Sequence, residues 1–227
     1  MEISNINIFN KKFVLNIITP EFMDNDDNDK DIADDIIKLG QTAIDSKTSL
    51  FQLRNKNISG NDFYYIAMKL IKFFNLYSNK ENKPILIVND RADIADIVGA
   101  DGVHIGDDDL PLSYIKKIYP QLIAGVSVKN IDEAKKAEAE GADYIGAGSV
   151  FETSSKSDAG KPIGLDILAK ICDSVKIPVI AIGGINLDNV EKVIETGIKG
   201  IAVIGAVSGA KDPLTAAIKL NSYNYKQ

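Results

Sequence analysis

The sequence predicts a (β/α)8 barrel of the TIM type, formed by the whole chain, 1–227, as a single domain. Three observations support this fold class. Strand-like apolar runs alternate with helical patterns eight times along the chain. Runs such as PILIV and IPVIAI are continuously apolar, which is typical of parallel strands buried on both faces. A weak internal repeat, VGADGVHIG, EGADYIGAG and TGIKGIAVIG, places a glycine shortly before each of three strands.

The elements follow one another in a regular order. Strands are expected at about 13–19, 49–54, 84–89, 101–105, 121–126, 143–147, 177–182 and 199–204. Helices, with apolar residues three and four apart, are expected near 30–46, 60–78, 91–98, 112–118, 130–140, 164–174, 187–196 and 213–221. Each strand is therefore followed by one helix.

The glycines of the repeat, Gly99, Gly141 and Gly197, are expected to end helices, because glycine readily adopts the left-handed conformation of a C-cap. Their spacings of 42 and 56 residues each correspond to two βα units of a closed barrel. An open doubly wound sheet is the alternative. It would need a glycine fingerprint after the first strand, and TPEFMDNDDN contains none.

The composition excludes several classes of function. A formal net charge of −6 offers no broad basic face for nucleic acid or for a membrane surface. One cysteine permits no disulfide framework, and neither a signal peptide nor a membrane-spanning run is evident. We therefore expect a cytoplasmic protein whose anionic ligands are met by local cations.

On this fold, chemistry belongs to the loops that follow the carboxyl ends of the strands. Unusual polar residues follow six of the expected strands, and one such coincidence would mean little because loops are polar. Candidates for binding are Gln52, Arg54, Lys56, Asn89, His104, Ser127, Thr153, Ser155, Lys156, Gly184, Gly205 and Ala206. His104, the only histidine, should face the barrel interior, where a structural hydrogen bond is as good an explanation as a role in the site.

Asp90 and Asp109 are candidate ligands of a Mg²⁺ ion. They follow neighbouring strands, which lie about 4.8 Å apart, so their carboxylates can converge. Two carboxylates suit a Mg²⁺ ion that is shared with substrate phosphates and water. Alternatively, Asp109 caps the helix that is entered at Pro111, and its neighbours Asp107 and Asp108 are simply solvated.

Gln52, Arg54 and Lys56 alternate along one face of an extended segment. Only two of the 26 basic residues are arginines, Arg54 and Arg91, and arginine grips phosphate through two bonds where lysine offers a point charge. Beside a metal held by carboxylates, such a wall of cations is typical of a pyrophosphate site. Arg91 has a simpler explanation, which is pairing with a neighbouring acid.

Two later segments also have features of a site. The loop 148–164, GSVFETSSKSDAGKPIG, is long and rich in hydroxyl groups, as many lids are, although a surface loop explains it equally well. The glycines of AIGGI, together with Gly205 and Ala206, lie after the seventh and eighth strands, where phosphate sites are common on this fold.

In this order and spacing, the segments QLRNK, VNDRADIA, GADGVHIGDDDLP, AGVSV, GADYIGAGSVFETSSK and IPVIAIGGI resemble the thiamine phosphate synthase family. The resemblance implies a transferase that joins a hydroxymethylpyrimidine pyrophosphate to a thiazole phosphate, with release of pyrophosphate, by a dissociative mechanism. It also implies small-molecule substrates and a small homo-oligomer.

The resemblance implies roles for individual residues. Asp90 and Asp109 would hold Mg²⁺, while Gln52, Asn89 and Ser127 would hold the pyrimidine pyrophosphate together with the candidate catalytic residues Arg54, Lys56 and Lys156. Thr153, Gly184 and the backbone after the eighth strand would take the thiazole phosphate.

The chain also departs from the family pattern. Asn16 stands in place of an aromatic residue, Lys129 in place of a histidine, and Gly205 in place of a frequent serine. Two alternatives stay open: a thiazole tautomerase, which would lack the full metal and pyrophosphate set, and a non-catalytic barrel that binds phosphate ligands.

Overall fold

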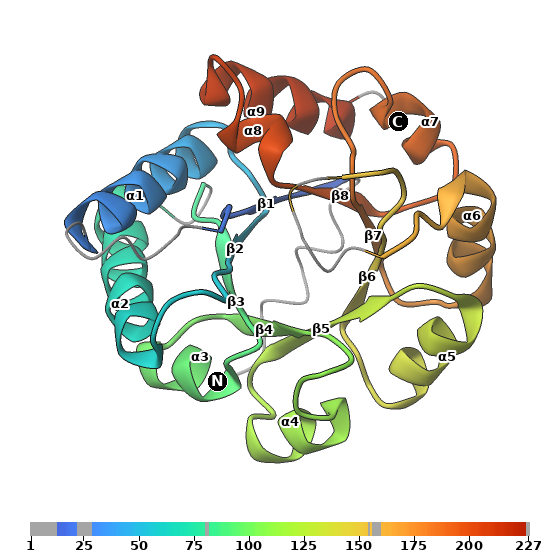
Figure 1. Cartoon of the computed structure of the whole chain (residues 1–227), viewed down its shortest axis with the longest axis horizontal. Helices are drawn as coiled ribbons and strands as arrows, with labels where there is room; N and C mark the ends of the chain where they lie inside the picture. Colours follow the sequence, from blue (N-terminus) through green and yellow to red (C-terminus); the bar gives the residue numbers. More distant parts are fainter. Residues whose placement is uncertain (1–12, 22–28, 80–81, 154, 156–159, 226–227) are drawn as a thin grey trace.

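The computed structural model of the chain describes residues 13–21, 29–79, 82–153, 155 and 160–225. In this part of the chain, eight parallel strands pair in sequence order and β8 pairs with β1, so the sheet closes into a barrel (Figure 1). The strands are β1 (Val14–Ile18), β2 (Leu50–Leu53), β3 (Ile85–Asn89), β4 (Gly102–Ile105), β5 (Ile123–Val128), β6 (Tyr144–Gly148), β7 (Val179–Ile182) and β8 (Gly200–Val203). The predicted (β/α)8 fold is confirmed.

Helices surround the barrel (Figure 1). They are α1 (Asp29–Asp45), α2 (Gly60–Tyr77), α3 (Ala92–Val98), α4 (Leu112–Ile118), α5 (Ile131–Ala139), α6 (Gly164–Ser174), α7 (Val190–Ile194), α8 (Gly205–Ser208) and α9 (Pro213–Asn221), followed by the 3₁₀ helix η2 (Ser222–Tyr225). Two details differ from the expectation. The short helix α8 was not predicted, and α7 begins later than residue 187 because the Asn186 side chain accepts a hydrogen bond from the Asp188 N–H in a turn.

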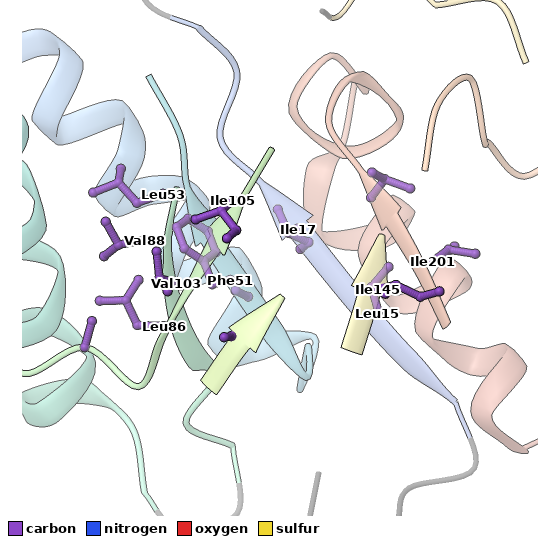
Figure 2. Packing of buried hydrophobic residues seen from close by; sticks show 14 of the residues in the cluster. Leu15, Ile17, Phe51, Leu53, Leu86, Val88, Val103, Ile105, Ile145 and Ile201 are labelled. Carbon is purple, nitrogen blue, oxygen red and sulfur yellow. The ribbon is translucent and has the colours of Figure 1, made fainter. Parts of the chain in front are cut away.

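Side chains of the strands alternate between two apolar layers, because successive residues point to opposite faces. Figure 2 shows the outer layer, in which residues such as Leu15, Phe51 and Val88 lie between the strands and the helices. A smaller inner cluster, which includes Val14, Ile87 and Tyr144, fills the barrel. Burial on both faces explains the continuously apolar runs of the sequence.

The sequence repeat corresponds to a structural one. Gly99 caps α3 in the left-handed conformation, and Gly141 and Gly197, both with positive φ, follow the C-caps of α5 and α7. Asp101 and Asp143 lie two residues after Gly99 and Gly141 and make equivalent hydrogen bonds. The Asp101 carboxylate accepts a hydrogen bond from the Leu86 N–H at 2.8 Å, and the Asp143 carboxylate accepts one from the Ala124 N–H at 2.7 Å. These hydrogen bonds connect the start of β4 to β3 and the start of β6 to β5.

No helix among the described residues is both long and apolar enough to cross a bilayer.

Candidate functional site

A cavity of about 560 Å³ opens at the carboxyl ends of the strands. Its walls come from the loops after six strands, β2 and β4 to β8. Eight of the predicted site residues line it: Lys56, Asp109, Ser127, Thr153, Ser155, Gly184, Gly205 and Ala206. The structure therefore brings together residues that are up to 150 positions apart in the sequence, as the barrel predicts.

Asp90 and Asp109 meet beside this cavity. The burial of Asp90 raises the pKa of its carboxyl group to about 6, and a hydrogen bond and the charge of Asp109 raise it as well, whereas Lys56 and Arg54 act in the opposite direction. Asp90 also has a φ of +63°, a conformation that aspartate tolerates better than most residues. Two acids are thus held together at a position where their negative charges repel.

Asp109 does not cap the helix that follows. The N-cap of α4 is Pro111, without a side-chain hydrogen bond, and one carboxylate oxygen of Asp109 instead accepts the Gly106 N–H at 2.7 Å. This contact turns the loop back toward β4, and the Asp109 side chain also hydrogen-bonds to Asp90. Asp107 and Asp108 are exposed, as expected, although Asp107 lies 3.3 Å from the Lys129 ammonium.

Arg54 and Lys56 lie in different surroundings. The Lys56 ammonium is 3.6 Å from the Asp90 carboxylate, and the Lys56 side chain is 43% exposed. The Arg54 side chain is only 2% exposed, and its guanidinium pairs with the Glu21 carboxylate. Glu21, which lies after β1, was not predicted as a site residue. Arg91, as its simpler explanation predicts, grips Asp93 through two bonds of 2.9 and 2.7 Å.

A row of three amides crosses the barrel interior beneath the cavity. Asn16 donates to the Gln52 side-chain oxygen at 3.2 Å, and Gln52 donates to the Asn89 side-chain oxygen at 2.7 Å. The three residues come from β1, β2 and β3, so neighbouring strands place their side chains in one layer. Asn89 ends β3 directly before Asp90, and this connects the row to the acidic pair.

His104 belongs to a second interior network. One ring nitrogen lies 3.0 Å from the Tyr144 hydroxyl, and the other lies 3.0 Å from the Ser127 hydroxyl. The histidine therefore faces the interior, as predicted, and it positions Ser127 at the floor of the cavity. Tyr144, which the sequence analysis did not single out, fills the space that Gly125 leaves on the neighbouring strand.

The turn after β7 requires both of its glycines. Gly183 and Gly184 have φ values of +102° and +66°. A Cβ atom on Gly183 would lie 2.7 Å from the Ser149 Cα, and one on Gly184 would lie 2.6 Å from the Glu152 carbonyl oxygen. The two loops after β6 and β7 therefore pack backbone against backbone along one wall of the cavity. Ser149, Glu152 and Asn186, which the sequence analysis did not propose, also line it.

Lys156, the third candidate catalytic residue, lies outside the described residues. Among the described residues, no group of three or more histidine, cysteine, aspartate and glutamate side chains could hold a metal ion. The predicted metal ligands Asp90 and Asp109 form a pair of acids, joined by a side-chain hydrogen bond.

Comparison with known proteins agrees with this architecture. A family model described as Thiamine monophosphate synthase matches residues 23–207. The Thiamine-phosphate synthase of Pyrococcus furiosus is 47% identical over 178 residues, which are 78% of this chain and 83% of that protein. The one from Pyrococcus horikoshii is 44% identical over 204 residues, which are 90% of this chain and 91% of that protein.

A solved structure gives the same result. Thiamine phosphate pyrophosphorylase from Pyrococcus furiosus superimposes with a TM-score of 0.80 at 39% identity, over 95% of this chain and 97% of that one. The match thus covers nearly the whole length of both chains. The chain therefore belongs to the thiamine-phosphate synthase family of transferases.

Proposed function

We propose that the chain transfers a hydroxymethylpyrimidine group from its pyrophosphate ester to a thiazole phosphate, in a Mg²⁺-dependent reaction that forms thiamine phosphate and releases pyrophosphate. The observation that carries this proposal is the convergence of Asp90, Asp109 and Lys56 at the mouth of the cavity, in a member of this family.

The acidic pair fits a divalent cation. The pKa of the Asp90 carboxyl group is raised by its burial, by the hydrogen bond with Asp109 and by repulsion from the charge of Asp109. Oxygen ligands are those that Mg²⁺ prefers, and substrate phosphates with water would complete its shell. When bound there, Mg²⁺ would withdraw negative charge from the departing pyrophosphate.

The residues of the chain would divide the remaining work. Lys56, Arg54 and Lys156 would attract the pyrophosphate oxygens, on which charge grows as the bond to the pyrimidine carbon breaks. Gln52, Asn89 and Ser127 would hold the pyrimidine ring. Thr153 and the backbone of Gly184, Gly205 and Ala206 would hold the thiazole phosphate, since the loops after the last two strands and a short extra helix are a common phosphate site on this fold.

The reaction itself would be dissociative. The electron-rich aminopyrimidine would stabilise the cation that remains when pyrophosphate leaves, and the thiazole nitrogen would then capture that cation. Such a course needs no nucleophile from the protein. The chain must hold the two substrates close together. The 560 Å³ cavity, which is lined by loops after six strands, supports that role.

One assay tests the proposal. Purified protein is mixed with both phosphorylated substrates, with and without Mg²⁺, and thiamine phosphate and pyrophosphate are measured together. We expect equal amounts of the two products, only with Mg²⁺. Asp90→Asn should abolish most of the activity, whereas Asp132→Asn, the same change at an exposed acid of α5 that does not line the cavity, should not.

The negative result is equally informative. Folded protein that leaves both substrates intact would overturn the proposal. Conversion of a thiazole phosphate isomer without pyrophosphate chemistry would then identify a tautomerase, and binding without any conversion would identify a phosphate-binding barrel.

A further inference from the structure

The side-chain oxygen of Asn16 is a buried hydrogen-bond acceptor in the barrel interior. The side chain is 2% exposed, and its amide nitrogen donates to Gln52. Its oxygen has no hydrogen-bond partner among the described residues. Buried polar atoms are nearly always paired, so an unpaired acceptor whose residue also lines a cavity points to a donor that is not among the described residues.

A small cavity lies next to this acceptor. Its volume is about 10 Å³, which is close to the space of one water molecule. Asn16, Gln52, His104, Ser127 and Tyr144 provide its polar walls. It shares Ser127, Gly146, Ile182 and Ala202 with the large cavity, so it lies directly beneath the floor of the candidate site.

The Asn16 oxygen can affect Gln52 and Asn89, because the three side chains form one row of hydrogen-bonded amides. At each of its two junctions a donor faces an acceptor, from Asn16 to Gln52 and from Gln52 to Asn89. If a single amide turned over, like groups would face each other, so the three amides must keep or reverse their direction together. A donor that binds the Asn16 oxygen therefore holds the whole row in the observed direction, including Asn89 at the end nearest the acidic pair.

We propose that the small cavity is a subsite for one hydrogen-bond donor the size of a single heavy atom, which donates to the side-chain oxygen of Asn16. Asn16 is then a positioning residue that fixes the direction of Gln52 and Asn89 toward the ligand. The donor is an O–H or N–H group, from a bound water or from the amino group of the aminopyrimidine. The functional part of this inference rests on the proposed function; the existence of the subsite does not.

Two measurements test the subsite. The first is a crystal structure at high resolution of the free wild-type protein, in which a water should lie within hydrogen-bond distance of the Asn16 oxygen. The second is the affinity for the aminopyrimidine pyrophosphate and for an analogue without the amino group, measured by calorimetry with Mg²⁺ and without thiazole phosphate. Both compounds are tested on wild type, Asn16→Leu and Ser49→Ala.

Asn16→Leu should weaken binding of the aminopyrimidine compound by about tenfold or more, because the row loses its first donor and the subsite loses its acceptor. Ser49→Ala is the matched control. Ser49 also carries a buried oxygen that has no partner in the described part of the chain. It lies at the opposite end of β2, and its removal should leave both affinities unchanged.

The two sources of the donor are distinguishable. If the amino group is the donor, wild type prefers the amino compound, Asn16→Leu loses that preference, and the water is absent from the complex. If water is the donor, the preference is the same in both proteins and the water persists in the complex. Either result supports the subsite.

The inference fails if the cavity is empty in both the free and the bound protein, or if Asn16→Leu binds both compounds as wild type does. Should Asn16→Leu not fold, the crystal structures and the two wild-type affinities decide. Wild type that binds neither compound would refute the proposed function instead, and the water in the free protein would still test the subsite.

Discussion

The two arginines of the chain occupy opposite environments. Arg54 is 2% exposed and pairs with Glu21 beside the acidic pair, whereas Arg91 is 45% exposed and grips Asp93 at the start of α3. A buried guanidinium that meets a carboxylate is costly to replace, because lysine cannot reproduce its planar set of donors. An exposed pair of the second kind contributes little.

This contrast predicts the effect of two matched substitutions. Arg54→Lys should lower kcat/KM by more than about tenfold, since the ammonium cannot satisfy Glu21 and act on the pyrophosphate at once. Arg91→Lys should stay within about twofold of wild type. Steady-state assays with varied pyrimidine pyrophosphate measure both, and equal rates for wild type and Arg54→Lys would exclude a role for the guanidinium.

A glycine can be required by its backbone conformation or by the space around it, and the turn after β7 distinguishes these two requirements. Gly184 (φ +66°) and Gly99 (φ +70°) have nearly the same conformation, but an added Cβ meets nothing within 4 Å at Gly99 and would meet the Glu152 carbonyl at 2.6 Å at Gly184. Alanine at either position carries the strain of a left-handed conformation, about 1–2 kcal/mol. Only at position 184 must the neighbouring loop also move.

Gly184→Ala should therefore lower the free energy of unfolding by at least about 1 kcal/mol more than Gly99→Ala does. It should also reduce activity, because the loop it displaces lines the cavity. Urea unfolding followed by circular dichroism gives the stabilities. Equal losses in the two variants would mean that the loops after β6 and β7 are not in the close contact described.

Asp101, which directly precedes β4 at the amino end of the barrel, should make the stability of the fold depend on pH. Burial raises the pKa of its carboxyl group, although the Leu86 N–H and Lys83 act in the opposite direction. The folded protein thus holds the proton more tightly than the unfolded chain does. The contribution of this group to stability is full below the unfolded pKa of about 3.9 and is lost as the pH rises through the folded pKa.

Asp101→Asn removes the charge and keeps an oxygen that can accept the Leu86 N–H. At pH 7 this variant should be at least as stable as wild type, and any advantage should shrink as the pH falls toward about 4. Asp101→Ala should instead lose about 1–3 kcal/mol at both pH values, because the N–H loses its acceptor. An advantage of Asp101→Asn that grows toward low pH would contradict this assignment.

The elements also show which features a sequence can predict. Periodicity is sufficient for the barrel, because each strand is buried on both faces and each helix on one. The start of α7 and the presence of α8 depend on turns such as that of Asn186, whose hydrogen bonds have no periodic signal. In the site, unusual polar residues after strand ends were predictable from the fold. Glu21 and Tyr144 were not, because their roles depend on their partners Arg54 and His104, which lie in or directly after other strands.

The charges around the large cavity bear on the proposed role of Mg²⁺. The chain has a net charge of −6, and among the described residues that line the large cavity there are four acids, Asp107, Asp108, Asp109 and Glu152, against the lysines Lys56 and Lys129. A pyrophosphate that enters alone meets more negative than positive charge. Bound Mg²⁺ would reverse that balance at Asp90 and Asp109.

Thermal unfolding of the wild-type protein tests this balance. Inorganic pyrophosphate and Mg²⁺ together, at about a hundred times the dissociation constant, should add about 2.7 kcal/mol. For a chain of this size that corresponds to a rise in Tm of roughly 5–10 °C. Pyrophosphate with EDTA should give almost no rise, since the acids then repel it. An equal rise with EDTA would show that lysine and arginine side chains suffice, and would remove Asp90 and Asp109 from the binding of pyrophosphate.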